Sequence, residues 1–502
     1  MENKINRITD ILRRDDGISG AMMYTEQISW ILFLKYLNDY EEAKHDEALL
    51  DGKEYTYILD EKYRWNNWAC PRKDGKLDKI NAKSGDDLLL FVNGSRNSDE
   101  VGLFDYLRGF KSINEDVKSV RYKIGAIFEF LDNRIANGHT LREVLDLIDE
   151  MNFHSQADLF QLSLIYEKLL KDMGSDGGNS GEFYTPRPLI KMITAVVNPQ
   201  IGETIYDPAA GSCGFLIEAY NHIRYVNDDM TKPRDLSIEQ YKFLREDTFF
   251  GNEKTPLSYV MGVMNMILHG IEAPNIAKTN TLTRDIRSFE EKDRYNCILA
   301  NPPFGGKEKE QIQQNFPITS NATELLFLQH MMKSLKVNGR CGVVIPEGVL
   351  FQTNNAFQAV KQDLLERFNV HTIVSLPSGV FLPYSGVKTN VIFFDRNGST
   401  SEIYYYEVNP PYKLTKNKPI QNEHFAEFLA CWQERKLTEN SWIVNVNEIK
   451  DYDISAKNPN KAETVAHVSP LELVATIKQN NAQIDELMTE IEAILQSKAI
   501  NE

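Results

Sequence analysis

From about Leu159 onward, short apolar segments alternate with stretches of helical periodicity. Strands that alternate with helices in this way build parallel sheets covered by helices on both faces. We therefore predict an α/β fold with a Rossmann-like, doubly wound sheet, whose ligands bind at the carboxyl ends of its strands. The segments predicted as strands are Thr204–Tyr206, Phe249–Gly251, Cys297–Ala300, Cys341–Ile345, Thr372–Leu376 and, as a late strand that can run antiparallel, Val391–Phe394. Helices are predicted at Leu257–Leu268 and Glu324–Leu335.

The segments on either side of this region have helical character. Residues 1 to about 155 carry apolar side chains at helical spacing, interrupted by a polar insert from about 51 to 85. Near the end of the chain, Ile477, Ile484 and Ile491 repeat at heptad spacing, which is typical of a coiled coil or of a helix packed on its own domain. We predict a helical N-terminal docking domain at 1–155, an α/β domain at 156–460 and a C-terminal helix for partner docking at 461–502.

The predicted strand Cys297–Ala300 leads directly into Asn301-Pro302-Pro303-Phe304. An aromatic amine is a poor nucleophile because its lone pair is delocalised into the ring. The side-chain oxygen of Asn301 and the backbone carbonyl of Pro302 can accept its two hydrogens, and the two prolines hold that carbonyl in place. Phe304 offers a flat face on which an extruded base can stack. The alternative is a turn in which the prolines only end the strand.

A glycine-rich turn follows the first predicted strand and opens a helix. It reads Asp207-Pro208-Ala209-Ala210-Gly211-Ser212-Cys213-Gly214, and its glycines allow the backbone to approach a ligand closely. Asp207 can balance the positive charge of a sulfonium cofactor. Glu253, at the end of the next strand, is placed to accept hydrogen bonds from both ribose hydroxyls. For Glu253 alone, a solvated side chain is the simpler interpretation.

Two further segments are weaker candidates for cofactor binding. Glu182-Phe183-Tyr184-Thr185-Pro186-Arg187 precedes a helical stretch. Thr185 is predicted as its N-cap and Pro186 as its first residue, and the free amides there can bind a carboxylate. Capping without a ligand is the alternative. Asp285 can accept a hydrogen bond from the cofactor's adenine amine, or it can be a structural loop carboxylate.

Taken in order along the chain, Tyr184-Thr185-Pro186, Asp207–Leu216, Glu253 and Asn301–Phe304 resemble the amino-methyltransferases of DNA. More closely, and over nearly its whole length, the chain resembles the modification (M) subunit of type I restriction–modification systems. The resemblance implies the sheet of S-adenosylmethionine-dependent methyltransferases and a site-specific, adenine-specific DNA methyltransferase, which transfers the methyl group of S-adenosylmethionine to the adenine 6-amino group.

The resemblance also implies where the site residues lie. It places the cofactor pocket at Glu182–Arg187, Gly211–Cys213 and Glu253, and the catalytic loop at Asn301–Phe304. Cys213 departs from the family, which more often has glycine or alanine there. We expect a tight but functional turn at this position, sensitive to thiol reagents.

Partners follow from the same resemblance. Two M subunits join one specificity subunit, which chooses the DNA sequence, and a motor subunit adds cleavage; the target adenine is flipped out of the duplex. The formal net charge of −16 agrees with this, since a protein that grips DNA alone normally carries a basic surface. Acidity that only favours solubility is the alternative.

Other classes are disfavoured by the sequence. The five cysteines form no C-x-x-C pair and the nine histidines lack metal-ligand spacing, so we expect no metal. We find no membrane span, no signal peptide and no G-x-x-x-x-G-K-[ST] loop, which indicates a cytoplasmic protein without a motor activity of its own. The open alternatives are the same chemistry on the 4-amino group of cytosine or on a protein glutamine amide, and a non-catalytic assembly subunit.

Overall fold

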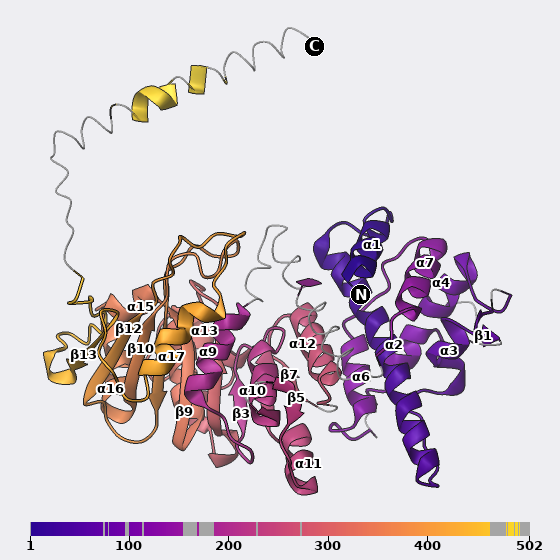
Figure 1. Ribbon diagram of the computed structural model, residues 1–502, viewed down its shortest axis with the longest axis horizontal. Helices are drawn as coiled ribbons and strands as arrows, with labels where there is room; N and C mark the ends of the chain where they lie inside the picture. The colour runs from indigo at the N-terminus through magenta and orange to yellow at the C-terminus, as the bar shows by residue number, and fades with distance from the viewer. Residues whose placement is uncertain are drawn as a thin grey trace. The chain divides into compact units, whose positions relative to one another are not determined.

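The structure is a computed structural model that describes residues 2–73, 76–78, 80–95, 100–112, 115–153, 168–169, 185–226, 229–271 and 274–461, with 478, 480–485, 487–489 and 491 (Figure 1). By their contacts, Met1–Lys457 form one compact unit and Asn458–Glu502 a second. Within the part of the chain described, no helix is long and apolar enough to cross a bilayer.

The N-terminal part is helical, as predicted (Figure 1). Its elements are α1 (Glu2–Leu12), α2 (Ala21–Leu50), α3 (Trp65–Trp68), a small hairpin of β1 (Arg72–Lys73) and β2 (Lys76–Leu77), α4 (Gly85–Asn93), α5 (Leu103–Arg108), α6 (Val120–Phe128) and α7 (Gly138–Asp149). The insert that we predicted to be polar contributes to the core, because Trp65 and Trp68 are buried. The indole nitrogen of Trp65 donates to the carboxylate of Asp149 at 2.8 Å, which satisfies its only polar atom.

A nine-stranded mixed sheet forms the central part. Its strands, in sequence order, are β3 (Ile205–Asp207), β6 (Phe249–Glu253), β7 (Asn275–Lys278), β8 (Tyr295–Ala300), β9 (Leu335–Pro346), β10 (Asn369–Ser375), β11 (Thr389–Asp395), β12 (Glu402–Glu407) and β13 (Ser441–Asn445). Across the sheet they follow the order β13-β12-β10-β11-β9-β8-β3-β6-β7. All strand pairs are parallel except those formed by β11 and β13. The late strand predicted at Val391–Phe394 is therefore confirmed as antiparallel.

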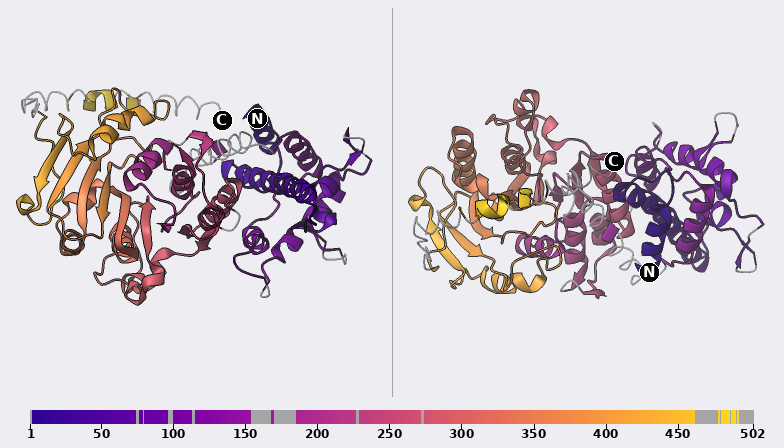
Figure 2. Two further views of the ribbon diagram at one scale, coloured as in Figure 1. Left: turned by 60° about the horizontal axis from the view of Figure 1, so that its bottom comes forward. Right: turned by 90° about the horizontal axis from the view of Figure 1, so that it is seen from above.

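Alternate residues of each strand pack on opposite layers of helices, as the pleat of a strand requires. In β8, Cys297 and Leu299 belong to one core cluster, and Ile298 and Ala300 to the other. The first cluster includes residues of α9 (Arg187–Val197), α10 (Gly214–Arg224) and α12 (Pro256–Leu268). The second includes residues of α14 (Thr323–Ser334) and α16 (Asn355–Arg367). The sheet is thus doubly wound, as predicted, and Figure 2 shows it from two further directions.

The remaining elements are short. They are the hairpin of β4 (Tyr225–Val226) and β5 (Asp229–Pro233), the helices α11 (Ile238–Glu246), α13 (Glu310–Gln313), α15 (Glu347–Phe351) and α17 (Ala426–Cys431), and the 3-10 turns at 61–63, 281–283, 286–288, 291–293, 422–425 and 446–448. The hairpin and α11 account for the long spacing between Asp207 and Glu253. A capping box between Ser237 and Gln240 fixes the start of α11.

Helix α12 connects the N-terminal helices to the sheet. It packs against α2 and α6 on one side and against α10, β6 and β7 on the other. Ser29 of α2 donates to the sulfur of Met261 at 3.1 Å, and the hydroxyl of Tyr36 donates to the carbonyl of Ile267 at 3.2 Å. The N-terminal helices therefore rest on the helix that also supports the glycine turn after β3.

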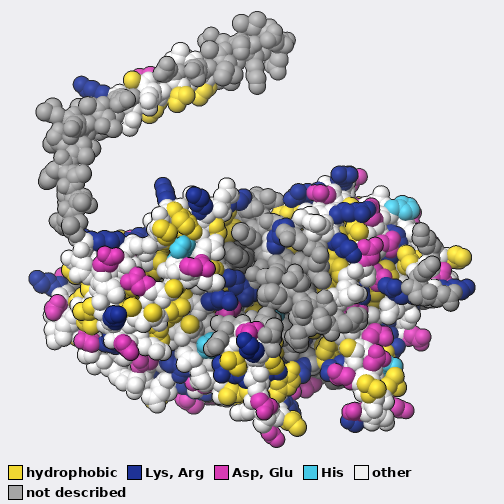
Figure 3. All heavy atoms as spheres, viewed as in Figure 1, with side chains coloured by type: hydrophobic (Ala, Val, Ile, Leu, Met, Phe, Trp, Pro, Cys, Tyr) yellow, Lys and Arg dark blue, Asp and Glu magenta, His cyan; other side chains and the backbone are white. Residues whose placement is uncertain are grey.

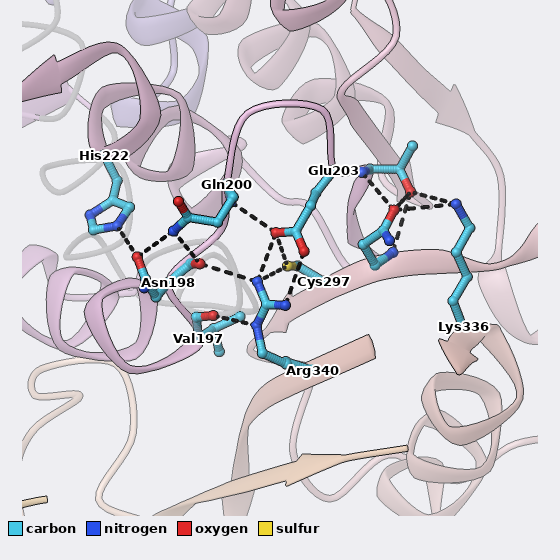
Figure 4. Close-up of polar contacts among 10 residues, drawn as sticks. Val197, Asn198, Gln200, Glu203, His222, Cys297, Lys336 and Arg340 are labelled. Carbon is cyan, nitrogen blue, oxygen red and sulfur yellow. Dashed lines mark hydrogen bonds and ion pairs between the residues drawn. The ribbon is translucent and has the colours of Figure 1, made fainter. Parts of the chain in front are cut away.

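At the end of the sheet opposite the predicted ligand site, Arg340 ties β9 to neighbouring segments (Figure 4). Its guanidinium donates to both carboxylate oxygens of Glu203, at 3.0 and 2.7 Å, and to the carbonyl of Val197 at 2.8 Å. It also contacts the sulfur of Cys297 at 3.2 Å. Bidentate bonds of this kind combine charge with fixed geometry. Arg340 thereby holds the connection between α9 and β3 against β8 and β9.

This network predicts a pH-dependent stability. Burial raises the pKa of Glu203, but the bonds from Arg340 and from the backbone of Gln200 more than offset this, so the pKa lies below its usual value. A lowered carboxyl pKa stabilises the fold above the unfolded-state pKa, and this stability is lost as the pH falls through the folded-state pKa. We expect Arg340→Gln to lower the free energy of unfolding by about 1.5–3 kcal/mol at pH 7, and the difference from wild type to shrink below about pH 4.

Denaturant titrations at pH 7, 5 and about 3, below the usual pKa of a glutamate, measure this difference. Arg435→Gln, which removes an ion pair with Glu402 elsewhere on the sheet, is the matched control. A destabilisation by Arg340→Gln that grows as the pH falls would contradict the assignment.

Candidate active site

The catalytic loop predicted at Asn301–Phe304 begins where β8 ends, at the carboxyl edge of the sheet. The side-chain nitrogen of Asn301 donates to the hydroxyl oxygen of Thr185 at 3.0 Å. The side-chain oxygen of Asn301 is buried and accepts no hydrogen bond from the described residues. A buried acceptor without a partner carries a free-energy cost of about 1–3 kcal/mol unless a ligand satisfies it. The amide is therefore oriented with its acceptor available.

Thr185 does not cap the following helix as we predicted. Helix α9 begins at Arg187, Pro186 occupies the N-cap position, and no side chain caps the first turn. The hydroxyl of Thr185 is instead bonded to Asn301. The backbone carbonyl of Pro186 accepts the first helical bonds, from Leu189 and Ile190. Because Pro186, with its fixed φ, takes the N-cap position, the helix begins one residue later than we predicted. Thr185 therefore stays in the preceding loop, where its hydroxyl reaches Asn301 at the end of β8.

Phe304 is half-buried and packs on the ring of Phe381, with the ring centroids 5.7 Å apart and the planes at 80°. This edge-to-face geometry is favourable for aromatic pairs. Phe381 lies in the segment between β10 and β11, which sequence reasoning did not identify. Beyond Phe304, Gly305 has a φ of 71°, a conformation that glycine adopts without strain. The loop then continues to the exposed lysines Lys307 and Lys309.

The glycine turn after β3 is held by bonds to β6. The backbone nitrogen of Gly211 donates to Glu253 at 2.9 Å, and that of Ala210 donates to the carbonyl of Asn252 at 2.9 Å. The other carboxylate oxygen of Glu253 accepts from the backbone of Thr255 at 2.7 Å. Glu253 is buried, so it is not the solvated side chain of the simpler interpretation. Its carboxylate retains lone pairs for further donors, since each oxygen has two.

The turn packs closely on α12 at Gly262, where the structure leaves no room for a side chain. A Cβ at Gly262 would lie 2.7 Å from the carbonyl oxygen of Gly211 and 2.8 Å from the sulfur of Cys213. Gly211 and Cys213 have φ values of 50° and 62°, so the cysteine occupies a conformation that costs an L-residue energy. Asn265 of α12 donates to the carbonyl of Ser212 at 3.0 Å.

Cys213 is fully buried, and burial raises the pKa of its thiol well above the usual value, with the charges of Asp207 and Glu253 adding to the effect. Thiolate is the reactive form of cysteine. The turn is tight, as expected, but a buried and protonated thiol disfavours the sensitivity to thiol reagents that we expected from the sequence.

Asp207 is also fully buried. Burial raises the pKa of its carboxyl group to about 8; the bond from the backbone of Ala209 opposes this shift, and the nearby charge of Glu253 adds to it. Asp207 and Glu253 bring two carboxyl groups close together and away from water. A cation bound beside them would be stabilised. The residues present therefore fit the positively charged part of a sulfonium cofactor.

The structure places the other predicted residues as follows. Arg187 forms an ion pair with Glu218 of α10 at 3.1 Å, which joins α9 to α10. Asp285 lies in the crossing from β7 to β8, where its carboxylate accepts from the side chain of Arg287 at 2.8 Å. Glu182, Phe183 and Tyr184 lie outside the described residues.

Besides Phe381, sequence reasoning missed two polar residues that hold the site together. Asn265 was hidden in an apolar helix, although a polar residue within such a stretch is itself a signal. Thr281 donates from its buried hydroxyl to the carbonyl of Pro208 at 2.5 Å, and nothing in its local sequence indicates that contact. Both residues fix backbone carbonyls of the turn between Asp207 and Gly214.

The surface of the molecule carries charges of both signs. On the face drawn in Figure 3, lysine and arginine side chains are interspersed with aspartate and glutamate. The net charge of −16 is therefore spread over a mixed surface, and local basic groups such as Lys307 and Lys309 occur within it.

A doubly wound sheet with an antiparallel β11, a glycine turn after β3 and an Asn-Pro-Pro-Phe loop after β8 define the fold of an S-adenosylmethionine-dependent amino-methyltransferase. The N-6 DNA Methylase family model matches residues 156–468, and that of the HsdM N-terminal domain matches residues 1–86. The chain belongs to the N-6 DNA methylase family, as a methylase subunit of the type I restriction enzymes, and it methylates adenine in DNA at N6.

Individual relatives agree with this assignment. The methylase subunit of the type I restriction enzyme EcoEI from Escherichia coli is 34% identical, over 98% of this chain and 96% of its own length. The corresponding EcoKI subunit is 29% identical, over 92% and 82%. Among solved structures, a chain described as a modification subunit of a type I restriction enzyme from Vibrio vulnificus has a TM-score of 0.81 and 37% identity, over 93% of this chain and 98% of its own.

Proposed function

We propose that Asn301–Phe304 bind the 6-amino group of an adenine flipped out of DNA, and that the turn at Gly211–Cys213 and Glu253 hold S-adenosylmethionine. The observation that carries this proposal is the amide of Asn301. Its nitrogen is bonded to Thr185 and its buried oxygen has no partner among the described residues. An amine hydrogen is the donor that this oxygen lacks, and the backbone carbonyl of Pro302 can accept the second hydrogen.

The chemistry follows from these contacts. With both hydrogens accepted, electron density returns from the ring to the nitrogen, whose lone pair would then be free to attack a methyl carbon in line with its bond to sulfur. The carbon–sulfur bond would break with its electron pair going to sulfur, and the methylated nitrogen would lose one of its two hydrogens to solvent as a proton. The two prolines fix the Pro302 carbonyl before substrate arrives, so little reorganisation is needed during the reaction. Phe304, supported by Phe381, provides a surface for stacking the base. S-adenosylmethionine, when bound, supplies a methyl group activated by the neighbouring sulfonium.

We propose matching roles for the cofactor residues. Asp207 faces the cationic part of the cofactor, and a bound cation lowers its pKa from about 8 and favours the carboxylate. Glu253 accepts hydrogen bonds from the ribose hydroxyls. It uses the lone pairs that the backbone amides of Gly211 and Thr255 do not occupy. We keep Ser212 and Thr185–Arg187 as proposed pocket residues; Glu182–Tyr184 lie outside the described residues and stay a prediction from the sequence. Asp285 is retained for the adenine amine of the cofactor, for which it must share its carboxylate with Arg287.

Thr185 tests the orientation of Asn301. Thr185→Val removes the acceptor at 3.0 Å while preserving the shape of the side chain, so the amide of Asn301 loses the bond that fixes it. A bond of this kind is worth about 1–2 kcal/mol, which corresponds to about a 10-fold reduction in kcat. We expect KM for S-adenosylmethionine to change little, because the cofactor's carboxylate would contact backbone amides in this segment and not the Thr185 hydroxyl. We expect Thr185→Ser to restore kcat. The readout is steady-state methylation of DNA; equal kcat values for the valine variant and wild type would refute the role.

The family assignment favours the 6-amino group of adenine over the two other substrates that the sequence left open. These are the 4-amino group of cytosine and the side-chain amide of a protein glutamine. The intact Asn301–Phe304 loop argues against a non-catalytic subunit. Digestion of methylated DNA to nucleosides identifies the product, and N6-methyladenine is the one we expect.

We further propose the partners of the type I systems for this chain: a specificity subunit bound by two copies of it, and a motor subunit in the full complex. Its domains would be the N-terminal docking domain at 1–155, the methyltransferase domain at 156–460 and the tail at 461–502. A solved chain from a study of complex assembly and conformational transition of the type I R-M system is 43% identical, with a TM-score of 0.75 over 99% of this chain and 98% of its own.

The tail is a candidate docking element. Of its heptad residues, Ile484, Leu487, Met488 and Ile491 are helical and half or more exposed, while Ile477 lies outside the described residues. Exposed apolar side chains at this spacing favour contact with another helix. We expect deletion from Ser469 onward to abolish co-elution with the specificity subunit on gel filtration and to shift the melting temperature by no more than a few degrees. An unchanged complex would refute tail docking.

A further inference from the structure

A cavity of about 410 Å³ lies between α14, α16 and the chain segments around them. Arg294 immediately precedes β8, and Arg396 immediately follows β11, which runs antiparallel. Both therefore lie at one end of the strands, and Asn301, which follows the last residue of β8, lies at the other end. The cavity is thus separate from Asn301 and from the glycine turn, although Arg287 in its lining is bonded to Asp285, the outlying candidate for the cofactor's adenine. Its size is typical of small-molecule pockets.

The lining of this cavity carries more basic than acidic side chains. Five basic side chains and two acidic ones line it, in a chain whose net charge is −16. They are Arg287, Arg294, Lys333, Arg367 and Arg396, with Asp363 and Glu366. Carboxylates balance part of this charge: Asp363 pairs with Arg367 at 2.9 Å, Asp285 with Arg287 at 2.8 Å and Glu291 with Arg294 at 3.0 Å. No described carboxylate forms an ion pair with Lys333 or Arg396, and Glu366 accepts hydrogen bonds from Gln362 and Tyr452.

Two of the guanidinium groups have donors to spare. The Nε of Arg294 is buried and has no hydrogen-bond partner among the described residues, although its terminal nitrogen pairs with Glu291 at 3.0 Å. Arg396 donates to the carbonyl of Leu335 at 2.8 Å, and no described carboxylate forms an ion pair with it. Burial lowers the pKa of Arg396, the nearby charges of Arg294 and Arg367 lower it further, and the charge of Glu291 opposes the shift. Like charges held together in this way are stabilised by an anion between them.

We propose that this cavity, which we name the arginine pocket (Arg294, Arg367, Arg396 and the side chains around them), binds a small phosphate-bearing ligand of the nucleoside polyphosphate class. Guanidinium groups present pairs of donors that match phosphate oxygens. Apolar side chains, among them Ile318, Met332 and Phe368, complete the lining and suit a ring that carries the phosphates. The pocket has no part in the methyl transfer proposed above.

Calorimetric titration of the full-length protein at about 0.15 M salt, near physiological ionic strength, tests the proposal with two probes, pyrophosphate and ATP. Saturating S-adenosylhomocysteine is present throughout, so that the adenine of ATP does not enter the methyl-donor site. We expect pyrophosphate to bind and ATP to bind more tightly, because only ATP reaches the apolar lining. Arg294→Gln and Arg396→Gln should each weaken both probes about 10-fold.

Two further variants separate binding from folding. Arg435→Gln removes an arginine outside the pocket and should leave both affinities unchanged. Ala359→Trp fills the pocket from α16 without removing a charge and should abolish ATP binding while the melting temperature stays within a few degrees. If neither pyrophosphate nor ATP binds at millimolar concentration, the proposal is overturned. Equal affinities in wild type, Arg396→Gln and Ala359→Trp would also overturn it, since the probes would then bind elsewhere.

Discussion

Asn301→Ala is expected to lower kcat for DNA methylation by about 100- to 1000-fold, the range seen when one preorganised polar contact to a transition state is removed. The substitution deletes the buried oxygen that has no partner among the described residues, and with it the acceptor for one amine hydrogen. Affinity for S-adenosylmethionine should change little, because the Asn301 side chain is bonded only to the hydroxyl of Thr185 among the described residues, whereas the cofactor is proposed to contact backbone amides and Glu253.

Single-turnover methylation of a DNA substrate, with the specificity subunit present, measures the first effect, and calorimetry with S-adenosylmethionine measures the second. Asn447→Ala changes an exposed asparagine after β13 and serves as the matched control. An Asn301→Ala enzyme with wild-type turnover would remove the proposed mechanism. A variant that loses cofactor binding instead would indicate that Asn301 supports the fold of the pocket.

Gly262→Ala is expected to have the second large effect, a loss of affinity for S-adenosylmethionine of at least about 10-fold. Alanine normally stabilises a helix relative to glycine by about 1 kcal/mol. Here the added Cβ would meet the Gly211 carbonyl oxygen at 2.7 Å and the sulfur of Cys213 at 2.8 Å, both held in the turn. Overpacking a rigid contact costs about 1–3 kcal/mol. The cost therefore exceeds the gain, and the turn must shift away from the cofactor.

The same substitution at Gly348 provides the comparison. Gly348 lies in α15. The nearest atom that a Cβ added there would meet is at the end of the flexible Gln352 side chain, 3.2 Å away. We expect Gly348→Ala to keep cofactor affinity and thermal stability. If Gly262→Ala also keeps both, then the close packing of α12 on the turn is not required for binding.

Sequence periodicity predicted the strands that are buried on both faces, because continuous apolar runs signal such strands directly. It missed β7, which has only four residues with Ile276 as its single buried one, and β13, an edge strand in which only the first two residues are buried. It also missed β12, a run of buried tyrosines that reads as amphipathic. At edges and in tyrosine-rich strands, partner strands decide the structure more than local composition does.

The candidate site divides in the same way. The motifs at Asp207–Gly214 and Asn301–Phe304 are local, so their spacing indicated a nucleotide turn and an amine-binding loop. The contact between Asn301 and Thr185 joins residues 116 positions apart, and no local pattern encodes it. The same holds for Asn265 and Thr281, whose bonds to carbonyls of the turn depend on tertiary packing.

The position of α12 has a consequence for regulation. This one helix supports the Gly211 turn on one side and, through Met261 and Ile267, bonds to Ser29 and Tyr36 of α2 on the other. A molecule that binds the N-terminal helices and moves α2 would therefore change the affinity for the methyl donor. By thermodynamic reciprocity, the methyl donor must then change the affinity for that molecule by the same factor. Cofactor saturation and complex assembly would thus be linked equilibria in this protein.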